Sequence, residues 1–405
     1  MNILLIDHYA GSPELGMEFR PYYLAKEWVK QGHNVLIVGA TYSHLRKKQP
    51  VKGKQNIDGI NYYWIKTNQY KGNNGVGRIL SMFLFIFKLF FFSKTYKDFN
   101  PNIVIASSTY PLDIYPAHKI AKRYHAKLIF EVHDLWPLSP IELGGYSKRH
   151  PFIIVMQWAE NYAYKHTNAV VSILPKANKH MENNGLEKDK FYHIPNGIVI
   201  SDWERPLELP EEHLKLLNEL KEAKKFIIGF AGAHGIANSL DIVIKVIANL
   251  VNKNVVLVLV GTGTEKNRLQ NYVKEKKISN VHFLPTIQKL QIPSFLKFMD
   301  ALYIGLQKQP LFRFGISPNK IFDYMMAKKP IIQAIEAGNN IVKEANCGLY
   351  AEPDNIEEIT CAICHLQEIQ EEERRKLGEN GYQYVMKYHT YDVLGKNFLN
   401  IMQNI

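Results

Sequence analysis

Residues 2–40, NILLIDHYAGSPELGMEFRPYYLAKEWVKQGHNVLIVGA, decide the fold. They open with a short apolar run, Ile3–Asp7, of the kind that forms a buried parallel strand. A loop that contains glycine and proline follows, and Phe19–Gln31 then has helical spacing that ends before Gly32. Val35–Val38 is a second apolar run. Strand, helix and strand in this order predict a βαβ unit, and therefore a parallel sheet with helices on its faces.

The same pattern continues along the chain in two series, separated by a charged, proline-punctuated and helix-forming zone at residues 204–225. This organisation predicts an α/β protein with two doubly wound, Rossmann-like domains that face each other across a cleft, residues 1–200 and 201–383. Ligands of such folds bind outside the carboxyl ends of the strands. The further predicted strands are Ile103–Ala106, Leu128–Glu131, Ala169–Ile173, Phe226–Phe230, Val255–Val260, Val281–Phe283, Ala301–Ile304 and Pro330–Gln333.

Composition narrows the class of protein. The 405 residues are 46% hydrophobic and 22% charged, which excludes a disordered or collagen-like chain. The formal net charge of +12 favours anionic partners, namely a nucleotide, a nucleic acid or an acidic membrane face. Only three cysteines are present, and the N-terminal apolar run is too short for a signal peptide. We therefore expect a cytoplasmic protein.

One apolar segment leaves two interpretations open. Ile79–Phe92 is nearly continuous in apolar residues, but Lys88 interrupts it and it falls short of the roughly 20 residues that span a bilayer. Arg78, Lys94 and Lys97 flank it. The segment is either a core helix with snorkelling lysines or a helix that lies on an anionic membrane surface.

A metal or haem site is not expected. Cys361-Ala-Ile-Cys364-His365 fits the short pattern for covalent haem, but it lies within a helical run. There the two cysteines are i,i+3 neighbours on the predicted apolar face, where cysteine acts as a small hydrophobe. No Asp-x-Asp stands near the glycine turns of the second half. We predict neither a metal nor a cofactor.

Three turns in the second half are candidates for binding a nucleotide. Gly229–Gly235 and Gly261–Gly263 each follow a predicted strand, and their glycines let backbone amides approach an anion. Phe283–Ile287 ends another strand and offers backbone groups to a planar base. Each turn alone is also typical of an ordinary strand–helix connection. The candidate donor-binding residues here are Gly232, His234, Asn238, Gly261 and Thr286.

The most informative stretch is Gly315–Met325, GISPNKIFDYM. Ser317 is a good N-cap, and the proline after it suits the first helical position. The helix N-terminus at Ser317 and Asn319, together with Lys320, suits a diphosphate. Asp323, one turn on, can accept both hydroxyls of a ribose. The alternative is a capped helix with a solvated lysine and aspartate.

The first half carries a different set of groups. Phe130–Pro137, FEVHDLWP, ends a buried strand, so that His133 and Asp134 emerge at its carboxyl end. Histidine there can shuttle a proton or hydrogen-bond a sugar hydroxyl, and Trp136 can stack on a sugar ring. A structural histidine is the alternative.

Two residues near the start of the first helix complete the candidates. Gly16 can place its amide against a phosphate, and Arg20 can clamp the phosphate of an acceptor. With Asp134 and Trp136, Arg20 forms the candidate acceptor site.

In order and spacing these motifs resemble the retaining family-4 glycosyltransferases of the GT-B fold. The likeness is closest to the N-acetyl-L-fucosamine-type transferases of bacterial O-antigen and capsule synthesis, and it covers nearly the whole chain. The motifs that carry it are Gly16–Gly32, Glu131–Pro137, Ile194–Gly197, Gly232–Asp241, Gly261–Gly263 and Ser317–Pro330.

The resemblance implies a UDP-sugar donor held mainly by the C-terminal domain, and a C-terminal helix, at about 384–405, that returns to the N-terminal domain. It implies that His133 lies beside the donor sugar and that Asp323 is the second acidic residue of a Glu-x7-Glu motif. The first acidic position falls on Gly315, and the usual basic positions after the glycine turn fall near Ala233 and Asn238. Lys320, Arg313 or backbone amides must then meet the diphosphate charge.

We therefore expect a retaining, metal-independent glycosyltransferase. It would move an N-acetylated amino sugar from a UDP-sugar to a polyprenyl-diphosphate-linked saccharide for bacterial surface polysaccharide, such as O-antigen, lipopolysaccharide or capsule. Residues 78–97 would hold it on the inner face of the cytoplasmic membrane. Two alternatives remain: a UDP-sugar 2-epimerase of the same fold, and a basic nucleic-acid-binding protein. Scattered Lys and Arg without a basic–aromatic motif disfavour the last.

Overall fold

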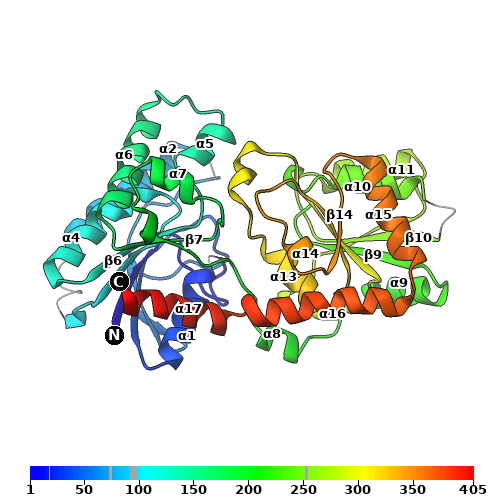
Figure 1. Cartoon of the computed structure of the whole chain (residues 1–405), viewed down its shortest axis with the longest axis horizontal. Coiled ribbons are helices and arrows are strands. Elements are labelled where there is room, and N and C mark those ends of the chain that lie inside the picture. The colour runs from blue at the N-terminus through cyan, green and yellow to red at the C-terminus, as the bar shows by residue number, and fades with distance from the viewer. Residues whose placement is uncertain (18, 73–74, 92–97, 251–253) are drawn as a thin grey trace. The chain divides into compact units, whose positions relative to one another are not determined.

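Two parallel sheets organise the chain, one in each of two structural units (Figure 1). The computed structural model describes residues 1–17, 19–72, 75–91, 98–250 and 254–405. Unit 1 comprises Met1–Asn196, Phe314–Ser317 and Tyr391–Ile405, and unit 2 comprises Gly197–Arg313 and Pro318–Thr390. The first boundary thus follows Asn196 rather than the predicted residue 200, and the inclusion of Phe314–Ser317 in unit 1 was not anticipated.

The sheet of unit 1 has eight strands among the described residues, in the order β3-β4-β2-β1-β5-β6-β7-β8. All neighbours are parallel except β3 and β4. The direction of strand order reverses between β1 and β5, the place where doubly wound folds bind ligands. The strands are β1 Asn2–Ile6, β2 Asn34–Ala40, β3 Gly53–Ile57, β4 Ile60–Ile65, β5 Ile103–Ala106, β6 Lys127–Val132, β7 Ala169–Ser172 and β8 Phe191–His193.

Helices cover both faces of this sheet because the strands are apolar on both sides. Leu4, Ile6, Val38 and Val104 are fully buried in its core. The helices of unit 1 are α1 Arg20–Lys30, α2 Val76–Phe91, α4 Ile114–Tyr124, α5 Leu138–Glu142, α6 Pro151–His166, α7 Asn178–Asn183 and α17 Tyr391–Asn404, with 3₁₀ turns η1 Pro111–Asp113 and η2 Lys188–Lys190.

The sheet of unit 2 is parallel throughout, in the order β11-β10-β9-β12-β13-β14. Its order reverses between β9 and β12. The elements before this reversal are α8 Ser201–Glu204, α9 Glu211–Glu222, β9 Phe226–Ala231, η3 Ile236–Asn238, α10 Leu240–Ala248, β10 Val255–Val260, α11 Lys266–Glu275 and β11 Val281–Leu284. Those after it are η5 Lys289–Gln291, α12 Ile292–Lys297, β12 Ala301–Gly305, η6 Pro310–Phe314, α13 Asn319–Met326, β13 Ile331–Ala334, α14 Ile341–Glu344, β14 Gly348–Tyr350, α15 Ile356–Glu368 and α16 Glu371–Tyr388.

The last helix, α17, packs on the first, α1, within unit 1 (Figure 1). The indole Nε1 of Trp28 donates to the carbonyl of Gly395 at 3.1 Å, and its ring meets that of Phe398 edge-on at 5.2 Å. A Cβ on Gly395 would come within 2.7 Å of the Glu27 Cβ, so glycine permits this close approach. The C-terminal residues therefore complete the core around α1.

The apolar helix α2 has two different faces. Met82, Phe85 and Leu89 are buried in the core of unit 1. A second apolar stripe faces solvent; its residues are 43–82% exposed and comprise Val76, Leu80, Phe83, Phe87 and Phe91. Residues 92, 94 and 97 of the predicted segment lie outside the described residues. Within the part of the chain that is described, no helix is long and apolar enough to cross a membrane.

Candidate active site

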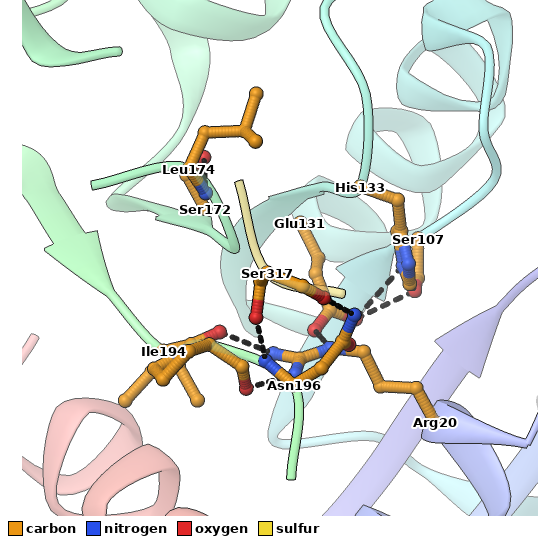
Figure 2. A network of polar contacts seen from close by, with 10 residues as sticks. Arg20, Ser107, Glu131, His133, Ser172, Leu174, Ile194, Asn196 and Ser317 are labelled. Carbon is orange, nitrogen blue, oxygen red and sulfur yellow. Dashed lines mark hydrogen bonds and ion pairs between the residues drawn. The ribbon is translucent and has the colours of Figure 1, made fainter. Parts of the chain in front are cut away.

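The polar network of unit 1 lies where β5 and β6 end side by side. Ala106 pairs with Phe130 in the parallel register, so the next residues, Ser107 and Glu131, stand opposite each other. The Ser107 hydroxyl donates to Glu131 Oε2 at 2.6 Å and lies 2.9 Å from His133 Nε2 (Figure 2). The His133 side chain is 14% exposed. The strand register therefore brings a carboxylate, a hydroxyl and an imidazole together.

Arg20, the first residue of α1, neutralises Glu131. Its Nε donates to Glu131 Oε1 at 2.9 Å, and both side chains are buried. Its Nη1 and Nη2 donate to the carbonyls of Pro195 and Ile194 at 2.5 and 2.8 Å. Burial alone would raise the pKa of Glu131, but Arg20, His133 and Ser107 together lower it to about 2. Glu131 is therefore a carboxylate at neutral pH.

Asn196, the next residue along the chain, is held by Ser317 within unit 1 (Figure 2). The Asn196 amide N–H donates to Ser317 Oγ, and its Nδ2 donates to the Ser317 carbonyl, both at 2.9 Å. The carbonyls of residues 194 and 195 accept from Arg20, and Ser317 thereby holds the residue that follows them.

Asp134 and Trp136 lie beyond His133 in a tight turn. Asp134 Oδ1 accepts from the Leu135 amide at 3.0 Å and from the Ser139 hydroxyl at 2.5 Å, and burial raises its pKa. The half-buried ring of Trp136 has the Arg78 guanidinium 5.9 Å from its centroid. An arginine over an aromatic face is a cation–π contact. Arg78 Nε also donates to the Tyr9 hydroxyl at 3.0 Å.

In unit 2, the turns after β9 and β10 pack against each other. Gly261 has a φ of +147°, and a Cβ there would collide with the Gly232 carbonyl oxygen. A Cβ on Gly263 would collide with the backbone of His234. The His234 amide donates to the Thr262 carbonyl at 2.8 Å. Glycine is therefore required at Gly261 and Gly263 for the two turns to touch.

Lys320 of α13 points into these turns. The Tyr324 hydroxyl accepts from the Ala231 amide at 3.1 Å and ties α13 to the end of β9. The Lys320 ammonium lies 3.9 Å from the centroid of the Phe230 ring and donates to Asn238 Oδ1 at 3.2 Å. A Cβ on Gly232 would come within 2.9 Å of Lys320 Nζ. Burial lowers the pKa of Lys320 to about 7. Among the described residues, no carboxylate forms an ion pair with it.

Two further basic groups surround this position. His234 is fully buried, and neither ring nitrogen has a hydrogen-bond partner among the described residues. Burial, then Lys266 and Lys320, lowers the pKa of His234 to about 4. Lys266 Nζ donates to the carbonyls of Gly261 and Leu284 at 2.7 and 3.1 Å. Among the described residues, no carboxylate forms an ion pair with Lys320 or Lys266, although the charge of Glu212 acts on Lys266.

The remaining candidates of unit 2 lie on other turns and on α13. Arg313 lines a hollow of about 720 Å³ beyond the ends of β12 and β13, with Lys308 and Glu336. Asp323 lies one turn after Lys320 on α13, and burial raises its pKa to about 6. Thr286 is exposed just after β11. Asn319 is exposed at the first position of α13.

Two family models match successive halves of the chain. Glycosyltransferase Family 4 matches residues 16–202, and Glycosyl transferases group 1 matches residues 215–384. The chain is a GT-B glycosyltransferase with a family-4 N-terminal half. No protein among the curated sequences compared matches this glycosyltransferase.

Solved structures share the fold of the glycosyltransferase over its whole length. HepE of Anabaena, in complex with UDP and glucose, has a TM-score of 0.68 at 15% identity and covers 100% of both chains. Sucrose-phosphate synthase from Thermosynechococcus elongatus has a TM-score of 0.74 at 14% identity, with 99% of this chain and 98% of that chain covered. WaaG, a glycosyltransferase involved in lipopolysaccharide biosynthesis, has a TM-score of 0.66 at 14% identity and covers 100% of both chains.

The structure corrects two predictions at the N-terminus of the glycosyltransferase. The Gly16 amide donates to the Ser12 carbonyl at 2.8 Å, so it is not turned toward a phosphate. Arg20 is only 3% exposed, and its guanidinium is occupied by Glu131 and by two carbonyls. It therefore anchors the polar network instead of lying open to an acceptor phosphate.

The start of α13 in the glycosyltransferase also differs from the prediction. The helix begins at Asn319 with Pro318 as its N-cap, and no side chain caps it. Ser317 was predicted as the N-cap, but its hydroxyl accepts from the Asn196 amide.

The sequence prediction missed three groups of the glycosyltransferase. Glu131 and Ser107 were not assigned roles, because only the strand register brings them together. Lys266 was not singled out, although a lysine three residues after Gly261–Gly263 is a signal that could have identified it.

The prediction for Cys361 was wrong. Cys361 is exposed on α15, so it is not on the apolar face as predicted.

Proposed function

We propose that this glycosyltransferase transfers a sugar from a UDP-sugar to a lipid-linked saccharide, in the synthesis of a bacterial surface polysaccharide. The observation that carries the proposal is the basic cluster of Lys320, His234 and Lys266 at the carboxyl ends of β9 and β10. Two lysines that form no ion pair among the described residues, beside a buried imidazole, suit the diphosphate of a nucleotide sugar. The cluster lies next to the reversal of strand order between β9 and β12, and such folds bind nucleotides at this place.

The comparisons support a uridine donor. HepE was solved with UDP and with UDP-glucose. The resemblance to transferases of N-acetylated amino sugars favours a UDP-linked sugar of that class, and WaaG acts in lipopolysaccharide biosynthesis. We propose that Asp323 binds the ribose and that Arg313 and backbone amides near Asn319 contribute to the donor site.

The chemistry proposed for unit 1 is a same-face, retaining transfer. A double displacement would need an available carboxylate as nucleophile. Glu131 is buried and paired with Arg20, and Asp134 accepts two local hydrogen bonds. Neither is placed as a nucleophile, so we propose that the acceptor hydroxyl attacks directly, assisted by the donor phosphate. His133 binds the reacting sugar, and the basic cluster, without a metal ion, stabilises the charge of the leaving diphosphate.

Thermal shift with UDP, GDP, ADP and TDP tests the donor site. A ligand that binds only the native state raises stability by RT ln(1 + [L]/Kd), about 2.7 kcal/mol at 100 times Kd. We expect a shift with UDP alone and the same shift with EDTA. A shift with no nucleotide would contradict the donor site. UDP release that requires no acceptor would favour the 2-epimerase instead.

The exposed stripe of α2 supports a membrane-bound acceptor. The side chains of Phe87 and Phe91 line a hollow of about 510 Å³ together with Lys52, Lys66 and Lys88. Apolar and basic groups side by side fit the interface of an anionic bilayer, where one apolar segment needs a basic patch to bind. We propose that this face, with its flanking basic residues between 78 and 97, binds the inner face of the cytoplasmic membrane.

Vesicle flotation tests the membrane face. The enzyme should float with phosphatidylglycerol vesicles, and Phe83→Ser/Phe87→Ser should bind at least tenfold more weakly, because burying one Phe contributes about 1.5–3 kcal/mol. Trp158→Ser is the matched control, since Trp158 is 64% exposed on α6 of the same unit. Equal flotation of all three proteins would contradict the proposal.

A further inference from the structure

The chain is bonded to itself at two of the points where it leaves unit 1. It passes from unit 1 to unit 2 after Asn196 and again after Ser317. The Asn196 amide donates to Ser317 Oγ, and Asn196 Nδ2 donates to the Ser317 carbonyl, both at 2.9 Å (Figure 2). One asparagine therefore holds both the side chain and the backbone of the residue that precedes the start of α13.

The link from Ser317 to Lys320 is short and stiff. Only Pro318 and Asn319 separate the two residues, and Lys320 is the second residue of α13. Pro318 has a φ of −73°, which its ring keeps near this value. No side chain caps the start of α13 within the described residues. An uncapped helix end tends to fray, so a bond just before the first turn limits the movement of that turn.

The centre of α13 is attached to the same stretch of chain. The amide of Ile198, two residues after Asn196, donates to the His389 carbonyl at 2.8 Å. The His389 ring stacks on Phe322 of α13, with ring centroids 4.4 Å apart and 25° between the planes, and both side chains are buried. Residues 196–198 are thus connected to α13 at two points, before its first turn and at its fourth residue.

The side chain of Lys320 has little room to shift. Its ammonium lies 3.9 Å from the centroid of the Phe230 ring and donates to Asn238 Oδ1 at 3.2 Å. A Cβ on Gly232 would come within 2.9 Å of Lys320 Nζ. Binding sites need their groups held to within about 0.5 Å of the productive geometry. A small displacement of the start of α13 would therefore change the contacts of this ammonium.

We propose that Asn196 and Ser317 are positioning residues that hold Lys320 where it binds the diphosphate of the donor. The inference rests on the proposed function, in which Lys320 belongs to the donor site. Neither residue has to touch the donor, because both act through the start of α13. The motif Ile194–Gly197 thereby gains a role that its sequence does not reveal.

Calorimetric titration of the full-length enzyme with UDP tests this role. Asn196→Ala and Ser317→Ala should each weaken UDP binding about two- to tenfold, the range for one hydrogen bond, and Ser317→Thr should restore the affinity. Asn2→Ala is the matched control, since Asn2 Nδ2 also donates to a backbone carbonyl, that of Phe99 at 2.7 Å, but at the amino end of β1. It should leave UDP binding unchanged. Wild-type affinity in Asn196→Ala would overturn the inference.

A double-mutant cycle separates positioning from a general loss of structure. If Asn196 acts through Lys320, the double variant Asn196→Ala/Lys320→Met should bind UDP as weakly as Lys320→Met alone. Two independent effects would instead multiply, and the double variant would then bind about two- to tenfold more weakly than Lys320→Met. That outcome would overturn the inference.

The placement of Lys320 can also be measured without a ligand. Burial lowers the pKa of Lys320 to about 7. In the enzyme labelled with ¹³C-lysine, the signal that is lost in Lys320→Met should titrate near this value. In Asn196→Ala its midpoint should move upward, toward that of an ordinary lysine, and an unchanged midpoint would overturn the inference. If Lys320→Met bound UDP like the wild type, the proposed donor site would fail, while the titration would still decide whether Asn196 positions Lys320.

Discussion

The polar groups of unit 1 and unit 2 are balanced in opposite ways. In unit 1, every charge of the Arg20–Glu131 pair is met inside the protein. In unit 2, neither Lys320 nor Lys266 forms an ion pair with a carboxylate among the described residues, and the ring nitrogens of His234 have no hydrogen-bond partner there. A network in which every charge is paired holds its side chains in place, whereas a cluster of unpaired positive charges can bind a negatively charged ligand. We therefore propose that the first region positions side chains and that the second binds an anion.

The largest expected effect is on the stability of unit 1. Glu131→Leu leaves Arg20 buried and unpaired, and should lower the free energy of unfolding by about 3–5 kcal/mol in urea titrations. Arg20→Met/Glu131→Leu removes both charges and should regain most of this loss, because an apolar pair can replace a buried ion pair. A double variant as unstable as the single one would show that the destabilisation does not come from the unpaired charge of Arg20.

Removing a charge from unit 2 should weaken ligand binding without lowering the stability of the protein. Lys320→Met should weaken UDP binding about 10–100-fold in calorimetric titrations, since a hydrogen bond to a charged group contributes about 1.5–3 kcal/mol. It should leave the melting temperature unchanged or higher, because the lysine is partly buried without an anion. Lys274→Met, on the exposed face of α11, is the control and should change neither. Unaltered UDP affinity in Lys320→Met would remove the main argument for the donor site.

The two regions also differ in what maintains their geometry, which is side chains in unit 1 and backbone turns in unit 2. Gly261→Ala forces a Cβ into the Gly232 carbonyl at positive φ, and should cost about 1–3 kcal/mol of stability and weaken UDP binding. Gly235→Ala is the comparison, since a Cβ at Gly235 meets nothing within 4 Å. Equal melting temperatures of the two variants would disprove the close contact.

The smallest expected effect is the pH dependence of UDP affinity. Lys320 has its pKa lowered to about 7, so it loses its proton as pH rises through 7. A phosphate is already doubly ionised above about pH 6, and His234 is neutral throughout. Affinity should therefore fall between pH 7 and 9 by up to about tenfold, with protons taken up on binding. In Lys320→Met the affinity should be flat across this range, and a fall of equal size there would assign the titration to another group.

Much of the fold followed from apolar runs alone. The predicted strands at 103–106 and 255–260 have those bounds in the structure, and the other predicted strands shift by one or two residues. The hairpin of β3 and β4 was not predicted. In β3, Lys54, Gln55 and Asn56 form an exposed edge strand with no apolar signal, whereas the apolar run of β4 was present but not identified. Short edge strands such as β8 and β14 carry too few residues to show a period.

The candidate site was less predictable, for a different reason. His133 and Lys320 could be selected because their neighbours in sequence mark a strand end and a helix start. Whether a polar group can bind a ligand or is already bonded within the protein depends on residues that are distant in sequence. Arg20 is occupied by Glu131, and Ser317 by Asn196. No local pattern reports such pairing, so the sequence misplaced both residues.

The packing of α17 on α1 has a consequence for synthesis on the ribosome. Trp28 of α1 has its indole hydrogen bonded to Gly395 and its ring packed on Phe398. Domains usually fold in order as they emerge, the N-terminal one first. Here unit 1 begins with Met1 but is completed by Tyr391–Ile405. The apolar side of α1 must therefore stay uncovered until Tyr391–Ile405 have been made, after the residues of unit 2.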